Sequence, residues 1–454
     1  MTLLEPLFRW ESVEQILSDR ARVQAMLDFE AALARAEARA GVIPANAVGP
    51  ISSKCKAELI DAEALARAAA KAGNLAIPLV KQLTKLVADS DAEAARYVHW
   101  GATSQDVIDT GLVLQLRSAL ELIESELAKL ADHTTTLVQK HRSTVTVGRT
   151  WMQQALPTTL GFQLAGWLDA VDRQRMRLHE IRGRCLVLQF GGAVGTLAAL
   201  GEKGLKVAEA LGPELKLQVP ALPWHAHRDR MAEIATTFGT CAGILGKIAR
   251  DISLAAQTEV AEIFEPAGEG RGGSSTLPHK RNPVACAIVL SAAIRIPGLV
   301  STMLGAAIQE QERGLGGWHA EWETLPEIVS LTAGALHHLT DTVAGLDIDV
   351  EKMRDNLDVT NGLIFAEAVQ TALAGKIGRM AAHELLEKTS KRVQSEGRHL
   401  REVLKEDSTV KQHLNNDELQ RLFDPKEYVG VAHKFIDRVL AGHTALRKSA
   451  GNTE

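Results

Sequence analysis

The chain has 454 residues, which is enough for about three ordinary domains or for one assembly of long helices. Aromatic residues make up only 4% of it and hydrophobic residues 46%, so the core is built mainly of Leu, Ile, Val and Ala, which suits closely packed helices. The formal net charge of −5, with both signs interspersed, gives no basic face and excludes a nucleic-acid-binding protein.

The N-terminal segment indicates no targeting signal. Its residues, MTLLEPLFRWESVEQ, contain neither the basic nor the apolar stretch of a secretion signal. The longest apolar run, near Val284–Ala293, is too short to span a bilayer. We therefore expect a cytoplasmic protein with no membrane association.

Apolar residues at helical spacing predict several long helices. The first has Leu116, Leu120, Ile123, Leu127 and Leu130 on one face, and the second has Ile234, Phe238, Cys241, Leu245, Ile248 and Ile252. A third begins at Pro283 and carries Pro297-Gly298, where we expect a kink, and a fourth covers roughly Pro326 to Gly345. Clear strand patterns are scarce. The fold class predicted is all-α.

The domain organisation follows from these helices. We expect an N-terminal helical domain at 1–110, a central helical bundle at 111–355 with a loop at 268–283, and a charge-rich C-terminal helical domain at 356–454. A bundle with apolar stripes on several faces also predicts partner subunits that cover them.

The metal and cofactor motifs in the chain are weak. Gly268, Gly270 and Gly273 satisfy GxGxxG, but they follow a predicted helix and no βαβ unit surrounds them. His225 and His227 form an HxH pair with no third ligand at a supporting spacing. The cysteines are Cys55, Cys185, Cys241 and Cys286, which follow no CxxC spacing and are predicted to be reduced residues of the core or of helices. We expect neither a metal nor a cofactor.

The segment ATSQDVIDT precedes the first long helix. Thr103 and Asp106 in it fit a capping box, which by itself would explain both residues. A functional role for this segment therefore needs further support.

The stretch GGSSTLPHKRNP, at 272–283, contains more glycine, hydroxyl and charged residues than a turn between helices requires. Glycines let the backbone approach a ligand, and the positive end of the helix beginning at Pro283 lies next to Lys280 in the sequence. A serine hydroxyl acts as a base only where donors stabilise its alkoxide, and the same cations stabilise a carboxylate whose neighbouring carbon gains or loses a proton. The pattern predicts proton transfer alpha to a carboxylate.

From Gly273 to Pro283 the chain resembles the signature of the fumarase/aspartase superfamily, which includes argininosuccinate lyase and adenylosuccinate lyase. Two further segments of that superfamily follow the expected order, HWGATSQDVIDT from His99 and GRTWMQQALPTTLG from Gly148. The resemblance covers the chain up to FDPKEYVG, at 423–430.

The resemblance implies a homotetramer around a central core of twenty helices, with each active site assembled from three segments on three chains. It also implies that Ser274 exchanges the proton at carbon and that Lys280 and Asn282 bind the carboxylate or its dianion intermediate. The substrate-binding candidates are His99, Thr103, Ser104, Trp151, Gln153, Ser275, Arg313 and His319.

Two departures from the superfamily pattern limit which of the superfamily's reactions the chain is expected to catalyse. Trp151 stands where the lyases and hydratases usually carry a histidine, and Ala287 stands where its glutamate partner lies. Such a pair transfers a proton to a leaving amine or oxygen. The absence of this pair indicates a leaving group that requires no proton transfer, such as a carboxylate. In this respect the chain resembles the cycloisomerase branch of the superfamily.

The alternatives are a C–N lyase like adenylosuccinate lyase and a non-catalytic protein on the same fold. Adenylosuccinate lyase holds a nucleotide phosphate with a serine-rich stretch, where this chain has ERGLGGWHAEWETLP with Trp318, His319 and Trp322. Bulky indoles suit a phosphate poorly, although Arg313 and His319 remain able to pair with carboxylates. We expect a cycloisomerase that closes a lactone on a small tricarboxylate, with His99 and His319 equally compatible with lining a helical cleft.

Overall fold

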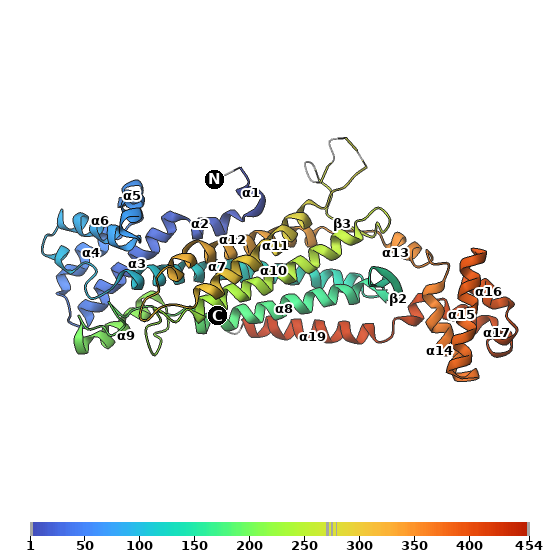
Figure 1. Cartoon of the computed structure of the whole chain (residues 1–454). Coiled ribbons are helices and arrows are strands. Elements are labelled where there is room, and N and C mark those ends of the chain that lie inside the picture. The colour runs from blue at the N-terminus through green and yellow to red at the C-terminus, as the bar shows by residue number, and fades with distance from the viewer. Residues whose placement is uncertain (1–2, 269–271, 274–275, 278, 452–454) are drawn as a thin grey trace. The chain divides into compact units, whose positions relative to one another are not determined.

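The computed structural model describes residues 3–268, 272–273, 276–277 and 279–451 (Figure 1). Within these residues the chain forms nineteen α-helices and four short strands, which confirms the predicted all-α class. The chain divides into two units. Unit 1 contains Met1–Leu127, Gln174–Gly246 and Ile288–His338, and unit 2 contains Ala128–Arg173, Lys247–Ala287 and Leu339–Glu454. The sequence-based division into three domains stays a prediction.

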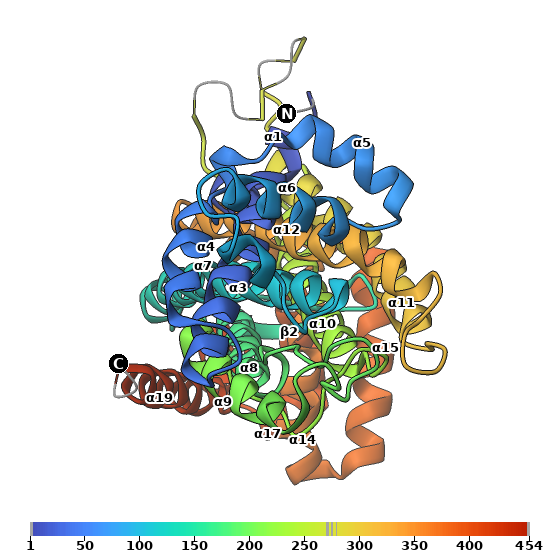
Figure 2. The ribbon, with the colours of Figure 1, turned by 90° about the vertical axis from the view of Figure 1, so that its left-hand side faces the viewer.

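Unit 1 contains seven α-helices of its own among the described residues: α1 (Glu5–Phe8), α2 (Glu11–Leu17), α3 (Asp19–Arg39), α4 (Val48–Lys54), α5 (Ala62–Ala72), α6 (Ala76–Ala88) and α9 (Gly204–Leu215). Helix α3 begins where the Ser18 hydroxyl accepts a hydrogen bond from Ala21 N–H. Helices α4 and α9 pack against α3, and α6 packs against α4 and α5 (Figure 2).

Five long helices have residues in both units: α7 (Ser104–Lys140), α8 (Leu160–Cys185), α10 (Asp229–Ala255), α11 (Val284–Ala306) and α12 (Gly317–Ala344). The apolar stripes predicted for α7 and α10 are confirmed, because every residue named in them is at most 1% exposed. The predicted burial of the cysteines is confirmed as well, since all four are buried and free.

The fourth predicted helix begins earlier than expected. Pro326 lies inside α12 rather than at its start. A proline has no N–H to donate to the carbonyl four residues before it. That carbonyl, on Trp322, instead accepts a hydrogen bond from the Arg22 guanidinium at 3.3 Å. A side chain from α3 thus supplies a partner that the proline cannot.

Helix α11 corrects the expectation that no apolar segment is long enough to span a bilayer. It has 23 residues with a mean hydropathy of 2.0 over its most apolar window, so its length and composition would allow a span, although only 28% of that window is buried. The uninterrupted apolar run in the sequence is shorter than this helix, because it ends before Arg295. Ile294 and Leu304 are exposed on this helix.

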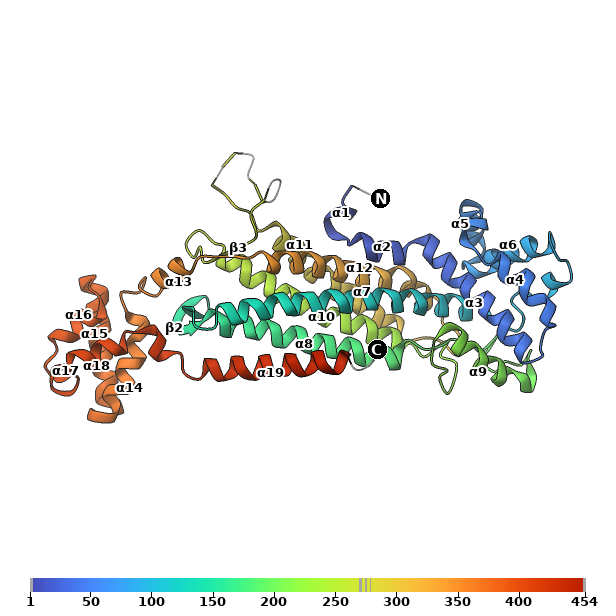
Figure 3. The same cartoon turned by 180° about the vertical axis from the view of Figure 1, so that it is seen from behind.

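Unit 2 contains the remaining α-helices: α13 (Val350–Asn356), α14 (Ala366–Ile377), α15 (Arg379–Glu396), α16 (Leu400–Glu406), α17 (Ser408–His413), α18 (Asn416–Leu422) and α19 (Ala432–Gly451). Helix α19 runs beside the unit 2 part of α8 (Figure 3). Phe162 packs on Phe435 there, with ring centroids 6.0 Å apart, and His443 contacts Asp172 at 2.9 Å.

The strands form two small antiparallel pairs in unit 2: β1 (Val145–Thr150) with β2 (Gln153–Thr159), and β3 (Ile263–Phe264) with β4 (Asp347–Ile348). Val145 and Val147 of β1 join one hydrophobic cluster with residues of α14 to α18. Arg149 at the end of β1 forms a two-point ion pair with the buried Glu262, at 2.6 and 2.9 Å. The hairpin is therefore anchored at its base and near its tip.

Short 3₁₀ turns complete the described elements: η1 (Ala45–Ala47), η2 (Ala57–Leu59), η3 (Ala94–Tyr97), η4 (Gly201–Lys203), η5 (Leu363–Phe365) and η6 (Pro425–Tyr428).

Candidate functional site

The candidate residues are divided between the two units. His99, Thr103, Ser104, Arg313 and His319 belong to unit 1, and Trp151, Gln153, Lys280 and Asn282 belong to unit 2. Ser274 and Ser275 lie outside the described residues.

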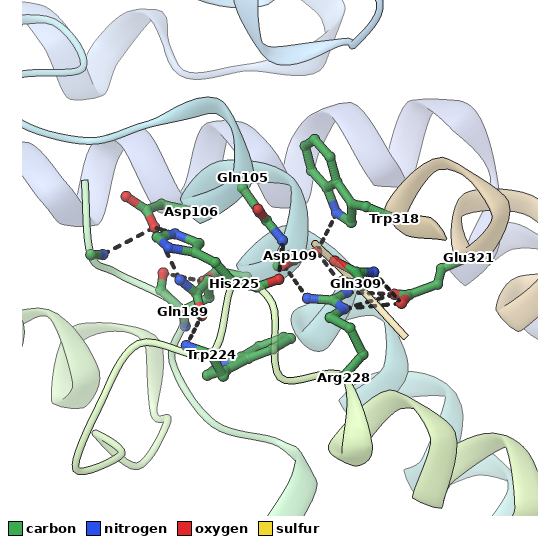
Figure 4. A network of polar contacts seen from close by, with 12 residues as sticks. Gln105, Asp106, Asp109, Gln189, Trp224, His225, Arg228, Gln309, Trp318 and Glu321 are labelled. Carbon is green, nitrogen blue, oxygen red and sulfur yellow. Dashed lines mark hydrogen bonds and ion pairs between the residues drawn. The ribbon is translucent and has the colours of Figure 1, made fainter. Parts of the chain in front are cut away.

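The segment before α7 is held by the carboxylate of Asp106. Thr103 N–H donates to Asp106 Oδ2 at 3.0 Å, which is one of the two hydrogen bonds of a capping box. The same carboxylate also accepts hydrogen bonds from Gly191 N, Gly192 N, Gln189 Nε2 and His225 Nε2, at 2.7 to 3.3 Å (Figure 4). Asp106 is fully buried. It therefore ties three chain segments together rather than only starting a helix.

The HxH pair does not form a metal site. His225 is buried against Asp106, whereas His227 is exposed, so their side chains face different environments. The described part of the chain contains no group of three or more His, Cys, Asp or Glu side chains placed to hold a metal ion. Of the GxGxxG glycines, Gly270 lies outside the described residues.

His99 precedes the Thr103 segment and contacts Glu30 of α3. Its Nδ1 lies 2.6 Å from Glu30 Oε1, and its backbone is in the left-handed region with φ of 58°. Burial alone would lower the pKa of His99, but the Glu30 carboxylate outweighs burial and raises the pKa above its ordinary value. His99 is thus stabilised as an imidazolium cation.

Arg313 lies against neutral acceptors. Its Nη1 donates to Thr103 Oγ1 at 3.1 Å, and its Nη2 donates to the Ala193 carbonyl at 2.9 Å. Among the described residues it forms no ion pair, so its charge is not neutralised by a carboxylate of the chain. This arrangement leaves Arg313 able to bind an anionic ligand.

A second buried cluster surrounds Arg228 (Figure 4). The guanidinium pairs with Asp109 at 2.6 Å and with Glu321 at 2.5 Å, and all three side chains are 1% exposed. Burial outweighs the effect of Arg228 and raises the pKa of the Glu321 carboxyl. Gln105 and Trp318 donate to Asp109, at 3.0 and 2.9 Å, and Gln309 donates to Glu321 at 3.4 Å.

The tryptophan-rich stretch therefore has two different faces. Trp318 and Glu321 point into the buried cluster, whereas His319 is exposed and contacts the Gly73 carbonyl at 3.1 Å. His319 also packs on Trp322, with ring centroids 4.5 Å apart. The residues Asp109, Arg228 and Glu321 were not predicted from the sequence, although Asp106 and Asp109, three residues apart on one helix face, indicated a polar cluster there.

In unit 2, the β1–β2 hairpin carries two of the candidate residues. Trp151 and Met152 are its turn residues, with φ of 52° and 65°, and they are 95% and 74% exposed. Two successive positive φ values define the type I′ turn, which strongly favours Asn-Gly. Gln153 follows as the first residue of β2 and is exposed. The hairpin was not predicted, because Trp-Met is no turn signal.

The described part of the loop brings Lys280 and Asn282 together. Both line a cavity of about 210 Å³ with Gly272 and Phe264. Asn282 N–H donates to the Gly272 carbonyl at 2.8 Å, and Gly272 has φ of 62°. A side chain at Gly272 would approach the Asn282 carbonyl to 2.6 Å, so this position requires glycine.

The start of α11 corrects one part of the anion hypothesis. Ala285 and Cys286 N–H groups donate to the Glu265 carboxylate, at 3.1 and 2.7 Å. The positive end of this helix is therefore occupied by a carboxylate of the chain itself, and the sequence could not show that Glu265 folds back onto it. Ala287, one turn into the helix, is exposed.

The helical architecture and these segments define a lyase. Residues 10–298 match the family model described as lyase, and residues 362–439 match the model described as the adenylosuccinate lyase C-terminus. The chain belongs to this lyase family, which confirms the resemblance found in the sequence.

Similar proteins carry a more specific name. The 3-carboxy-cis,cis-muconate cycloisomerase of Pseudomonas aeruginosa is 57% identical, over 98% of this chain and 97% of its own length. The protein of the same name from Bradyrhizobium diazoefficiens is 55% identical, over 96% and 97%. The crystal structure of 3-carboxy-cis,cis-muconate lactonizing enzyme from Pseudomonas putida is 53% identical, covers 98% of this chain and 99% of that one, and has a TM-score of 0.94.

Proposed function

We propose that the chain is an intramolecular lyase that converts 3-carboxy-cis,cis-muconate to 4-carboxymuconolactone without a metal or cofactor. Its family acts on small carboxylates, and the relatives that carry the cycloisomerase name match almost its whole length. These relatives favour the cycloisomerase over the alternative of a C–N lyase.

The observation that carries the proposal is the chemistry at Trp151 and Ala287. Both side chains are exposed, and neither an indole nor a methyl group exchanges a proton near neutral pH. A lyase that expels an amine or hydroxide needs proton transfer to the leaving group. Ring closure by a carboxylate does not, because the attacking carboxylate is already ionised at that pH.

In the proposed reaction, a carboxylate oxygen of the substrate forms a C–O bond to a carbon of its own diene. The π electrons of that double bond move toward the carbon alpha to a second carboxylate, which becomes a dianion. The Ser274 hydroxyl then donates its proton to that carbon and is reprotonated by water. The ionised substrate therefore takes up one proton, which water supplies through Ser274, and the acid forms of substrate and product are isomers, so no other reactant is consumed.

The cations of the site support this reaction. Among the residues that the structure describes, Arg313 donates only to neutral acceptors and Lys280 forms no ion pair. Lys280 and Asn282 line one cavity, which suits binding of the dianion. The other assignments are substrate contacts by His99, Thr103, Ser104, Trp151, Gln153, Ser275 and His319.

We also propose that the active unit is a homotetramer in the cytoplasm, with sites shared among three chains. The exposed apolar residues of α11 support burial against other subunits, since a water-exposed surface of this kind is a common assembly interface. The exposed Trp151 at a strained turn supports insertion of the hairpin tip into a neighbouring chain.

The function is tested by incubating the purified protein separately with 3-carboxy-cis,cis-muconate and with adenylosuccinate. We expect the diene absorbance of the muconate to fall, with a lactone as the single product by NMR, and no change with adenylosuccinate. Release of fumarate from adenylosuccinate, with no loss of the diene, would refute the proposal.

A further inference from the structure

We propose that Asp106 is a positioning residue for Arg313: its buried carboxylate fixes both of the acceptors that orient the guanidinium. The inference rests on the proposed function in one respect, namely that Arg313 binds a carboxylate of the substrate. Asp106 itself is expected to make no contact with the substrate, because its side chain is fully buried.

The two acceptors of Arg313 come from different segments. Thr103 Oγ1 lies just before α7, and the Ala193 carbonyl lies in the turn that follows Gly192. The two segments are far apart in the sequence, so contacts between them must fix the positions of these two oxygens. A guanidinium is planar, with donors at fixed angles, so its direction depends on where both oxygens lie.

Asp106 Oδ2 connects the two segments. It accepts from Thr103 N–H at 3.0 Å and from Gly192 N–H at 2.9 Å, so one oxygen atom holds the backbone beside each acceptor of Arg313. Its Oδ1 accepts from Gly191 N–H at 3.0 Å and from His225 Nε2 at 2.7 Å. His225 thereby fixes the rotation of the carboxylate.

A helix cap alone does not account for this arrangement. Capping the first turn of α7 requires one acceptor for one backbone N–H, whereas five donors converge on Asp106. Hydrogen bonds to a buried carboxylate are the strong, charge-assisted kind. An asparagine cannot replace it, because its NH₂ group would face a backbone N–H in either orientation.

The test is a double-mutant cycle on the full-length protein. Asp106→Asn, Arg313→Ala and the double variant are compared for binding of propane-1,2,3-tricarboxylate by calorimetry and for the KM and kcat of the muconate. We expect Asp106→Asn to weaken tricarboxylate binding about tenfold or more when Arg313 is present. In the Arg313→Ala background, Asp106→Asn should change the affinity for the tricarboxylate by less than about twofold.

A milder pair of variants covers the case in which Asp106→Asn does not fold. His225→Leu removes one donor to Asp106, and His225→Gln keeps one. We expect His225→Leu to weaken binding several-fold only when Arg313 is present, and His225→Gln to restore most of the affinity. His227→Leu is the matched control, because His227 is exposed and makes no contact with Asp106 in the described structure.

Additive effects of Asp106→Asn and Arg313→Ala would overturn the inference, since they would mean that Asp106 only stabilises the fold. A native protein that does not bind the tricarboxylate would overturn it too. The binding measurement needs no turnover. If the native protein binds the tricarboxylate but does not convert the muconate, the proposed function fails while the cycle still tests Asp106.

Discussion

Arg228 holds the carboxylate of Glu321 through two guanidinium nitrogens, and both side chains are 1% exposed. The other side of the same guanidinium pairs with Asp109, so two buried carboxylates depend on one cation. The cluster joins α7, α12 and the residue that directly precedes α10, all within unit 1 (Figure 4).

Replacing Arg228 with Met should destabilise unit 1 strongly. The change would leave Asp109 and Glu321 buried and close together without a cation, which typically costs about 3–5 kcal/mol. We expect a clear fall in Tm by circular dichroism. Arg230→Met is the matched control, because Arg230 lies two residues further along and donates to the exposed backbone carbonyl of Arg184. An equal fall in Tm in both variants would contradict a stabilising role for the buried contacts of Arg228 with Asp109 and Glu321.

Glu37 of α3 gives a prediction for pH. Burial, assisted by the nearby Glu30, raises the pKa of Glu37 from 4.5 to about 9. The folded protein therefore keeps this proton at pH values where the unfolded chain has lost it. The resulting stability is complete below about pH 4.5 and is lost as the pH rises toward 9.

Glu37→Gln should remove this dependence. We expect the free energy of unfolding of the variant to rise by roughly a few kcal/mol relative to that of the native protein as the pH rises from 6 to 9. Thermal unfolding at several pH values measures the difference. Glu58→Gln, at an exposed glutamate, should follow the native curve. A Glu37→Gln curve parallel to the native one would show that Glu37 is ionised in the folded protein.

The sequence predicted the long helices because a buried stripe repeats along them, as at Leu116 and Leu120. It singled out the loop at 272–283 because those residue types are unusual between helices, whereas the segment at Thr103 became a candidate only through the family resemblance. It could not predict that Glu265 occupies the start of α11 or that Asp106 meets His225, because these contacts join residues far apart in the chain. Periodicity reports which face is buried and not which polar groups meet there.

The turn of the β1–β2 hairpin predicts a trade between stability and activity. Trp151 and Met152 both have positive φ, which costs roughly 1–2 kcal/mol for each such residue. Replacing them with Asn-Gly should therefore raise the Tm. If Trp151 packs on the substrate or a neighbouring chain, the same variant should lose at least about tenfold in kcat/KM.

Met152→Gly alone separates the two effects, since it relaxes one turn residue and keeps the indole. We expect it to raise the Tm with little change in kcat/KM. Full activity of the Asn-Gly variant would show that Trp151 only occupies the space of the absent histidine.

Ser274→Ala tests the proton donor. General acid catalysis typically contributes about 10²–10⁴-fold, so we expect kcat to fall in that range while tricarboxylate binding is retained. The matched control is Ser275→Ala, which removes the adjacent hydroxyl and should cost less. Lactone formation at near the native rate by folded Ser274→Ala protein would assign the proton to another group.

Sharing of the site between chains is tested by mixing inactive variants. The Lys280→Ala and Arg313→Ala variants are unfolded together and the mixture is refolded. If Lys280 and Arg313 of one site come from different chains, some refolded sites will contain both native residues. Part of the activity should then return. A mixture of Lys280→Ala with Ser274→Ala is the control. These two residues are close together in the sequence, so one chain is expected to supply both to a given site, and no chain in this mixture has both in native form. Activity should therefore stay lost. Light scattering gives the mass of each refolded species. If the first mixture stays inactive while native protein regains activity after the same treatment, each site is built within one chain.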